Sequence, residues 1–450
     1  MKRILILGAG FSAPYLIHYL LQEAQANEWF ITVGDLDLAR AEKTVGGHPC
    51  GTAITFDIND AALRASQFEK ADVVVNFLSP VFQHLVALEC INYGAHMVSA
   101  SYTLNKTRDL DPDANRRGIL ILNEMGLDPG IDHMSAMALI HRIHNDGGQI
   151  RRFLSYGGGL PAPEVKSNPF RYCITWNPRN VVRAGEVGVQ YMEDGQIKVM
   201  PHHQVFHRTW RVDIDGVGTL EAYPNRDSLI YREVFGLNGV DTMIRGSLRW
   251  PGWSETWYHI VRLGLYNDTM PVPNLPERTY REFMRMFLPL QEPGRHVEQS
   301  IANYLQINPT GRIMENLQWL GLFSNETIGG DVSTPADVMT NLLARKLALP
   351  PKGRDMVILA HELDVTFADG RAPQHIKSTM VEYGKPGGFT AIAKTVGMPA
   401  AVATKLVLTG RLPITGCHIP THSAIYEPVM AELRENGIRF HEKVMAAEPA

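Results

Sequence analysis

The chain has 450 residues, of which 45% are apolar and 20% charged, and its formal net charge is −4. This composition is typical of a soluble globular protein with two or three domains, and its interspersed charges give no reason to expect a nucleic acid or a membrane as partner. The four cysteines are widely spaced without a CxxC pair, which indicates neither a disulfide framework nor a zinc site.

The first residues do not resemble a secretory signal. Lys2 and Arg3 are followed by only four apolar residues before Gly8, which is too short for the apolar region of a signal peptide. No later stretch approaches the length of a membrane span. We therefore expect a cytoplasmic protein.

Residues 1 to about 125 alternate between short apolar runs and helical patterns. The runs that predict strands are 4–7, 31–33, 53–56, 73–77, 97–99 and 119–123. The helical segments between them include 14–21, 61–69 and 82–93. This alternation predicts an α/β fold with a doubly wound parallel sheet.

The first predicted strand leads directly into Gly8-Ala9-Gly10-Phe11-Ser12-Ala13, and the first helix follows. Glycines at the turn and at the phosphate, with a small residue at the helix–strand contact, fit a dinucleotide pyrophosphate. The pattern alone is weak, and an ordinary glycine-rich turn is the alternative. However, the second strand ends at Asp35, where a carboxylate could bind both ribose hydroxyls of the adenosine half. We therefore expect a dinucleotide cofactor.

After Gly130 the pattern becomes a mixed α+β one, with many turns. Helices are predicted over 132–145, 277–287, 336–348 and 399–409, and strands over 153–156, 216–222, 242–249, 355–367 and 377–383. The predicted domains are a dinucleotide-binding domain over 1–130, a substrate-binding and dimerisation domain over 131–395 with a helical part at about 255–350, and a C-terminal segment over 396–450 that packs back on the first domain.

In doubly wound sheets, ligands bind at the carboxyl ends of the strands. The residues that follow the predicted strands are therefore site candidates: Asp57, Ile58, Leu78, Ser79, Pro80, Ala100, Ser101, Tyr102 and 125–129. Asp128 precedes a proline, which favours an extended backbone and could aim its carboxylate into the cleft, although a turn aspartate is the alternative. For Asp132, a helix N-cap is favoured over a site role.

Two later segments are also candidates. Residues 157–164 read GGGLPAPE, a loop in which glycine would let the backbone approach a ligand, and here a site and a plain connection are equally favoured. Arg226, Arg245 and Arg249 could bind carboxylates in a fork geometry. Arg245 and Arg249 are an even number of residues apart and would share one face of a strand.

Other reactive residue types are better explained without a site. His202, His203 and His207 could bind a metal, but no acidic residue with ligand spacing follows them, so surface histidines are favoured. Cys90 and Cys173 could be nucleophiles, but neither has an activating neighbour in the sequence, so buried apolar roles are favoured.

These segments together resemble a known family. GAGFSA, NEMGLDPGIDH, FLSYGGGLPAPE, YPNRDS, RGSLRW and VEYGKPGGFTAIAKTVGMPAAVATKLVLTG occur in the order found in the saccharopine reductases, the L-glutamate-forming saccharopine dehydrogenases of lysine metabolism. The resemblance covers essentially the whole chain. It implies a Rossmann domain, a dimerising substrate domain and a small helical part. It also implies a reversible, nicotinamide-dependent reduction of the imine between L-glutamate and 2-aminoadipate semialdehyde to saccharopine.

The resemblance also implies roles for single residues. Cofactor contacts fall on Gly8, Gly10, Phe11, Ser12, Ala13, Asp57, Ile58, Leu78, Leu127, Asp128, Pro129 and Trp176, to which the strand-end argument adds Asp35 and Ala100. Substrate contacts fall on Ser101, Tyr102, Asp128, Arg226, Ser247, Leu248 and Arg249. Asp128 and Tyr102 are the candidates for proton transfer at the amine nitrogen.

The chain departs from the family pattern at two positions. Gly157 stands where the family usually has a cysteine, so that thiol cannot be a required acid or base here. The residues after the second strand are Asp35 and Leu36, whereas NADP-using relatives tend to have an arginine there. Because a carboxylate would repel a 2′-phosphate, we expect NAD rather than NADP, although Arg40 could still reach a phosphate.

Two other functions remain as alternatives. One is a related imine-reducing enzyme such as a carboxynorspermidine dehydrogenase, whose polyamine substrate would favour an acidic pocket rather than arginines. The other is a nucleotide-sensing protein without catalysis, which the presence of Asp128, Tyr102 and the arginines disfavours. The expected partners are saccharopine, L-glutamate and 2-aminoadipate semialdehyde, with the protein a homodimer that binds neither nucleic acid nor membrane.

Overall fold

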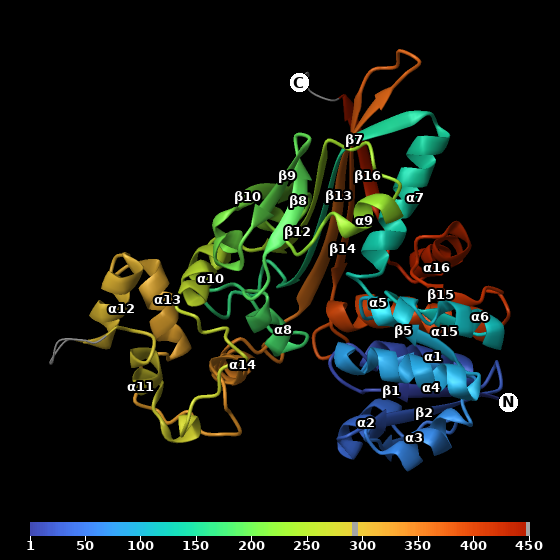
Figure 1. Ribbon diagram of the computed structural model, residues 1–450, viewed down its shortest axis with the longest axis horizontal. Helices are drawn as coiled ribbons and strands as arrows, with labels where there is room; N and C mark the ends of the chain where they lie inside the picture. Colours follow the sequence, from blue (N-terminus) through green and yellow to red (C-terminus); the bar gives the residue numbers. More distant parts are fainter. Residues whose placement is uncertain (290–295, 447–450) are drawn as a thin grey trace. The chain divides into compact units, whose positions relative to one another are not determined.

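The computed structural model describes residues 1–289 and 296–446 (Figure 1). The predicted helical part and the predicted C-terminal segment both include residues outside this range. The chain forms two compact units. Unit 1 comprises Met1–Ile150 and Val365–Ala450, and unit 2 comprises Arg151–Asp364.

Unit 1 contains a seven-stranded sheet in the order β15-β6-β5-β4-β1-β2-β3. All of its pairings are parallel. The doubly wound parallel sheet predicted from the sequence is thus confirmed. Its strands are β1 (Lys2–Leu7), β2 (Trp29–Asp35), β3 (Gly51–Thr55), β4 (Val73–Asn76), β5 (His96–Ser99), β6 (Leu120–Leu122) and β15 (Gly416–His418).

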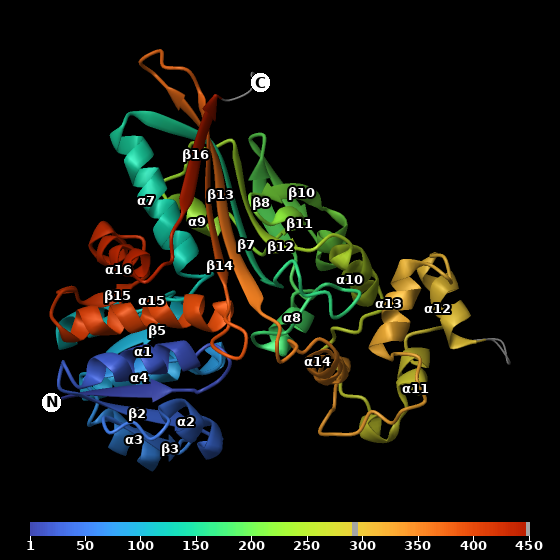
Figure 2. The ribbon, with the colours of Figure 1, turned by 180° about the vertical axis from the view of Figure 1, so that it is seen from behind.

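Helices connect these strands and cover the sheet (Figure 2). Capping residues set the ends of some of these helices. Asp37 and Asp60 accept backbone N–H groups at the N-termini of α2 and α3, and Gly46 ends α2 in the left-handed conformation. The helices of unit 1 are α1 (Pro14–Ala24), α2 (Leu38–Val45), α3 (Ala61–Phe68), α4 (Gln83–Tyr93), α5 (Asn105–Arg108), α6 (Asp111–Arg117), α7 (Ile131–Asn145), α15 (Ala391–Leu408) and α16 (Ser423–Glu435).

Helix α15 corrects one expectation from the sequence. Its 18 residues have a mean hydropathy of 1.4, so it is long and apolar enough to cross a membrane, although no such stretch was expected. Its apolar character has another cause, because 78% of it is buried. It packs on α1, where a Cβ on Gly397 would lie 2.9 Å from the backbone nitrogen of Leu16. We therefore interpret α15 as a core helix of unit 1.

Two further strands of unit 1 form an antiparallel pair outside the parallel sheet. They are β14 (Gln374–Tyr383) and β16 (His441–Ala446), with Gln374 opposite Ala446 and Thr379 opposite His441. Strand β16 lies towards the C-terminal end of the described chain, and all six of its residues are exposed.

Unit 2 is built on strands in the order β10-β11-β12-β7-β13, with β8 paired to β12 and β9 paired to β8. The β7–β12 pair is parallel, and the β10–β11 and β11–β12 pairs are antiparallel. The strands are β7 (Gly148–Pro161), β8 (Val189–Glu193), β9 (Gln196–Met200), β10 (Trp210–Ile214), β11 (Gly218–Pro224), β12 (Thr242–Arg249) and β13 (Asp355–Phe367).

The expectation of a loop over 157–164 is wrong for residues 157–161, which belong to β7. Gly157, Gly158 and Gly159 are part of β7, and Gly157 is paired with Ser247 of β12. A Cβ on Gly158 would lie 2.9 Å from the Leu248 side chain. The glycines therefore allow two strands to approach each other closely, a function that their composition alone does not distinguish from a loop.

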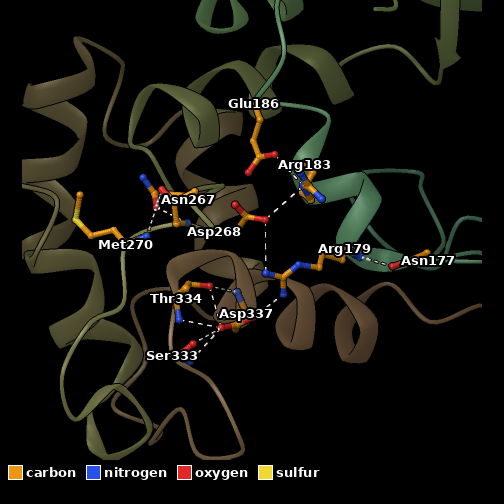
Figure 3. A network of polar contacts seen from close by, with 11 residues as sticks. Asn177, Arg179, Arg183, Glu186, Asn267, Asp268, Met270, Ser333, Thr334 and Asp337 are labelled. Carbon is orange, nitrogen blue, oxygen red and sulfur yellow. Dashed lines mark hydrogen bonds and ion pairs between the residues drawn. The ribbon is translucent and has the colours of Figure 1, made fainter. Parts of the chain in front are cut away.

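The rest of unit 2 is mainly helical. Its helices are α8 (Pro178–Arg183), α9 (Ile230–Val234), α10 (Trp253–Arg262), α11 (Tyr280–Arg285), α12 (Val297–Leu305), α13 (Arg312–Leu320) and α14 (Pro335–Lys346), with short 3-10 turns at His202–His207 and Leu275–Glu277. Ion pairs connect several of them (Figure 3). Arg179 of α8 lies 2.6 Å from Asp337 of α14 and 3.6 Å from Asp268, and Arg183 lies 3.3 Å from Asp268.

Candidate active site

The glycine turn has the geometry that a dinucleotide needs. Gly8 has φ +96°, and a Cβ there would lie 2.8 Å from the Phe77 carbonyl oxygen, so only glycine fits. Gly10 is exposed and would meet nothing within 4 Å, which leaves its backbone open to a ligand. Phe11 is exposed, Ser12 is half-buried and Ala13 is buried at the start of α1. The turn therefore offers backbone at a helix N-terminus, where phosphate binds.

Asp35 is engaged inside the protein. It is 8% exposed, its Oδ2 accepts a hydrogen bond from the Ala9 N–H at 2.7 Å, and its Oδ1 accepts one from the Asp37 N–H at 2.9 Å. The Arg40 Nη1 lies 3.6 Å from the same Oδ1, and the Arg40 side chain is 52% exposed. The carboxylate thus fixes the glycine turn to β2, and an exposed cation lies beside it.

The other predicted cofactor residues follow the parallel strands. Asp57 is exposed, and its Oδ1 accepts a hydrogen bond from the Asn59 N–H at 2.9 Å. Ile58 is buried, and the Leu78 N–H donates to Asn76 Oδ1 at 3.1 Å. Because these residues follow parallel strands of one sheet, they lie at the edge that the sequence analysis identified. Ala100, which follows β5, is half-buried at this edge.

The structure brings the two proposed catalytic side chains together. The Tyr102 hydroxyl donates a hydrogen bond to Asp128 Oδ1 at 2.7 Å, although 26 residues separate them in the chain. Both side chains are half-buried, as is Ser101. Leu127 and Pro129, on either side of Asp128, are buried, and the Asp128–Pro129 peptide bond is cis. A tyrosine–carboxylate pair of this kind can exchange a proton with a bound amine.

The prediction that Asp132 is a helix N-cap is wrong. Helix α7 begins at Ile131, with Gly130 as its N-cap, and Asp132 is in the first turn. Its Oδ1 accepts a hydrogen bond from the Gly130 N–H at 2.7 Å. Only glycine fits at residue 130, because a Cβ there would lie 2.0 Å from the Gly126 carbonyl oxygen.

Arg249 is the central charged group of unit 2. It is 7% exposed, and its guanidinium carbon lies 5.1, 5.5 and 4.8 Å from the ring centres of Tyr172, Tyr223 and Trp253. Its Nη1 donates to the Leu248 carbonyl at 2.8 Å, and its buried Nε has no hydrogen-bond partner. Within the described ranges, no carboxylate lies at ion-pair distance from it. We call these three rings and Arg249 the arginine cage.

Burial raises the pKa of the Tyr223 phenol, and the nearby Arg249 charge partly offsets this effect. Tyr223 is therefore a neutral wall of the cage at neutral pH. Trp176 is half-buried, and its Nε1 donates to the Tyr172 hydroxyl at 3.3 Å, which places it next to the cage. Sequence reasoning missed the three cage rings, although Tyr223 is part of the YPNRDS motif that helped to carry the resemblance.

The remaining predicted substrate residues lie near the same strand. Ser247 is half-buried and Leu248 is buried, both in β12. Arg226 is exposed in the turn after β11 and has φ +53°. Arg245 is buried, with its guanidinium 4.6 Å from the Tyr231 ring centre, so its aromatic neighbour differs from those of Arg249.

The histidines and cysteines show no sign of a metal or a nucleophile. His202 lies 2.9 Å from the Tyr266 hydroxyl and stacks edge-on with His203. In the part of the chain that the structure describes, no group of three His, Cys, Asp or Glu residues could hold a metal ion. Burial raises the pKa of both the Cys90 and the Cys173 thiols, which keeps them protonated and unreactive.

Comparison with known proteins identifies the family. Residues 4–122 match the model of the saccharopine dehydrogenase NADP binding domain, and residues 126–438 match that of the saccharopine dehydrogenase C-terminal domain. The chain belongs to the saccharopine dehydrogenase family. The resemblance seen in the sequence is thereby confirmed.

Individual members of the family match over the full chain. Saccharopine dehydrogenase [NADP(+), L-glutamate-forming] of Schizosaccharomyces pombe is 31% identical, with 100% of each chain covered. The Pyricularia oryzae protein of the same name is 33% identical, with 99% of each covered. A solved structure of apo saccharopine dehydrogenase (L-Glu forming) from Saccharomyces cerevisiae matches with a TM-score of 0.87 and 31% identity, covering 99% of this chain and 100% of that one.

The family also corrects the cofactor prediction. Both relatives are named as NADP(+) enzymes, and the model that matches the first domain is that of an NADP binding domain, so the preference for NAD is wrong. The physical reason lies in the role given to Asp35. Both of its oxygens accept backbone N–H groups of the protein itself, and Arg40 faces it. The carboxylate is therefore not the free ribose ligand that the sequence suggested.

Proposed function

We propose that this protein is an NADP-dependent saccharopine dehydrogenase that forms L-glutamate, acting on the CH–NH bond of saccharopine. The balanced reaction is saccharopine, NADP⁺ and water to L-glutamate, 2-aminoadipate 6-semialdehyde, NADPH and a proton, and it is reversible. The full-length relatives support the reaction type. The observation that carries the choice of substrate is the arginine cage.

The cage favours a ligand with carboxylates. Burying a cation without a counter-charge costs several kcal/mol, so a buried Arg249 without a carboxylate of the protein is best explained by a carboxylate of the ligand. A guanidinium can bind such a group through two parallel hydrogen bonds. Saccharopine has three carboxylates. A polyamine substrate has more amines and fewer carboxylates, and it would not complement this charge.

The residues of the glycine turn fit NADP. Gly8 and Gly10 leave backbone open at the N-terminus of α1 for the pyrophosphate. Arg40, with half of its side chain exposed beside the end of β2, would bind the 2′-phosphate through its guanidinium. When bound, the nicotinamide supplies the hydride acceptor and donor.

Tyr102 and Asp128 would move the proton in this mechanism. The secondary amine of saccharopine must lose a proton as its neighbouring carbon loses a hydride, and Asp128 is the candidate base. Tyr102 donates to Asp128 Oδ1, which orients the carboxylate. Arg249 would bind a carboxylate of the substrate through its guanidinium.

The experiment is a spectrophotometric assay. Saccharopine is mixed with the protein and either NADP⁺ or NAD⁺, and the absorbance of reduced nicotinamide is followed. We expect turnover with NADP⁺ to exceed that with NAD⁺. No signal with either cofactor would refute the proposed function. A homodimer and a cytoplasmic location stay predictions, which sedimentation and cell fractionation would test.

A further inference from the structure

A buried group of three titratable side chains lies in unit 1, close in sequence to Asp128. Glu124 is 1% exposed, Asp132 is 3% exposed and His133 is completely buried. His133 Nδ1 lies 3.0 Å from Glu124 Oε2, and His133 Nε2 lies 3.2 Å from Asp132 Oδ2. The imidazole thus has a carboxylate at each nitrogen.

The other oxygens of the two carboxylates hold backbone of two different segments. Glu124 Oε1 accepts a hydrogen bond from the Thr103 N–H at 3.0 Å, and Thr103 directly follows Tyr102. Asp132 Oδ1 accepts one from the Gly130 N–H at 2.7 Å, and Gly130 is two residues after Asp128. A continuous chain of contacts therefore runs from the Tyr102 segment through His133 to the Asp128 segment.

The backbone conformation of these segments makes such support necessary. Glu124 has φ +61°, which is uncommon for a residue with a side chain, and Gly130 has φ +149°. Residues in such conformations persist only where the surrounding structure holds them. His133 lies between the carboxylate of Glu124 and the carboxylate of Asp132, which accepts the Gly130 N–H.

We propose that His133 is a positioning residue for the reaction. By contacting both Glu124 and Asp132, it fixes the Tyr102 and Asp128 segments relative to each other, so that the phenol and the carboxylate meet at 2.7 Å. This role rests on the proposed function, because it acts through the proton-transfer pair. His133 is too deeply buried to touch the substrate itself.

Two substitutions at this position separate its two contacts. The amide nitrogen of His133→Asn would replace Nδ1 and keep the contact to Glu124, whereas that of His133→Gln would replace Nε2 and keep the contact to Asp132. A displacement of about 1 Å at a reacting group costs on the order of 100-fold in rate, so we expect each variant to lower kcat by about 10- to 100-fold. The Kd of NADP⁺ should change far less than kcat.

The matched control is His361→Gln. His361 is also completely buried, but it lies in β13 of unit 2 and stacks on Phe153. This variant should lose thermal stability and keep its kcat. An equal fall in kcat for the control and the His133 variants would show a general effect of core damage and would overturn the proposal.

The decisive readout is a double-mutant cycle with Tyr102→Phe, measured in kcat. If His133 acts through Tyr102 and Asp128, the double variant should be little slower than the slower single variant. Multiplicative losses would overturn the positioning role. Should the His133 variants fail to fold, Asp132→Asn gives the same test, because it keeps the Oδ1 acceptor for Gly130 and removes the charge beside His133. A wild-type protein without activity would instead refute the proposed function and this role with it.

Discussion

Replacing Arg249 by methionine tests the substrate site most directly. The substitution places an unbranched apolar side chain inside the cage of Tyr172, Tyr223 and Trp253 and removes the charge. Its effect on stability should be small because two effects oppose each other. Cation–π contacts with aromatic rings are lost, at about 0.5–2 kcal/mol each. On the other hand, the variant no longer buries an unpaired cation, which stabilises it by several kcal/mol.

The effect on binding should be large. Removing one partner of a desolvated ion pair with a ligand costs about 2–5 kcal/mol, which is about 30- to several-thousand-fold in affinity. We therefore expect Arg249→Met to raise the Kd of saccharopine by this factor while the Kd of NADP⁺ stays the same. Isothermal titration measures both constants, and chemical denaturation measures the free energy of unfolding.

Arg262→Met is the matched control. Arg262 also lies near an aromatic ring, with its guanidinium 5.6 Å from the Tyr258 ring centre, but its Nη1 donates to the Leu305 carbonyl at 3.0 Å. This variant should lose about 1 kcal/mol of stability and bind saccharopine normally. The opposite pattern, in which Arg249→Met unfolds the protein or leaves saccharopine binding intact, would show that the cage is structural.

Three further outcomes are expected. Arg40→Gln should weaken NADPH binding by about 10-fold and leave NADH binding unchanged, whereas Lys43→Gln on the same helix should change neither. A titration followed by the fluorescence of the reduced nicotinamide measures both affinities. Gly158→Ala should destabilise unit 2 by about 1–3 kcal/mol in urea because its Cβ would meet Leu248 at 2.9 Å, whereas Gly239→Ala, with nothing within 4 Å, should not. Burial opposes the ionisation of Asp337, but hydrogen bonds from Arg179, Ser333 and Thr334 lower its pKa below the unfolded value of about 4. The ionised carboxylate therefore stabilises the fold above about pH 4, and this stabilisation is lost as the pH falls towards the folded pKa. Asp337→Asn should therefore lower the melting temperature at neutral pH, and acidification should reduce its difference from wild type.

The first domain was predictable because each of its central strands is buried on both faces. Such strands have continuous apolar sequences, as in β1 and β4, and these are distinct from the amphipathic helices between them. Strand β15 has three residues, Gly416 to His418, and no apolar run, so nothing in its sequence marks it as a strand. Its place beside β6 comes from tertiary pairing.

The site was predictable for the residues that directly follow a strand of the parallel sheet. Tyr102 and Asp128 follow different strands of the same sheet, and the rule about carboxyl ends was sufficient to bring them together. The arginine cage needed three segments that are distant in the sequence. Tyr172, Tyr223 and Trp253 surround Arg249 only in the folded chain, and no spacing between them could indicate it.

Asp35 shows why the cofactor preference could not be read from one residue. A carboxylate at the end of β2 selects an unphosphorylated ribose only if its oxygens are free to accept the ribose hydroxyls. Here one oxygen holds the Ala9 N–H of the glycine turn and the other holds the Asp37 N–H, while Arg40 reduces its negative field. Since the same residue type can fix the turn or bind the ribose, the cofactor preference depends on the hydrogen-bond partners of the carboxylate, and these exist only in the folded structure.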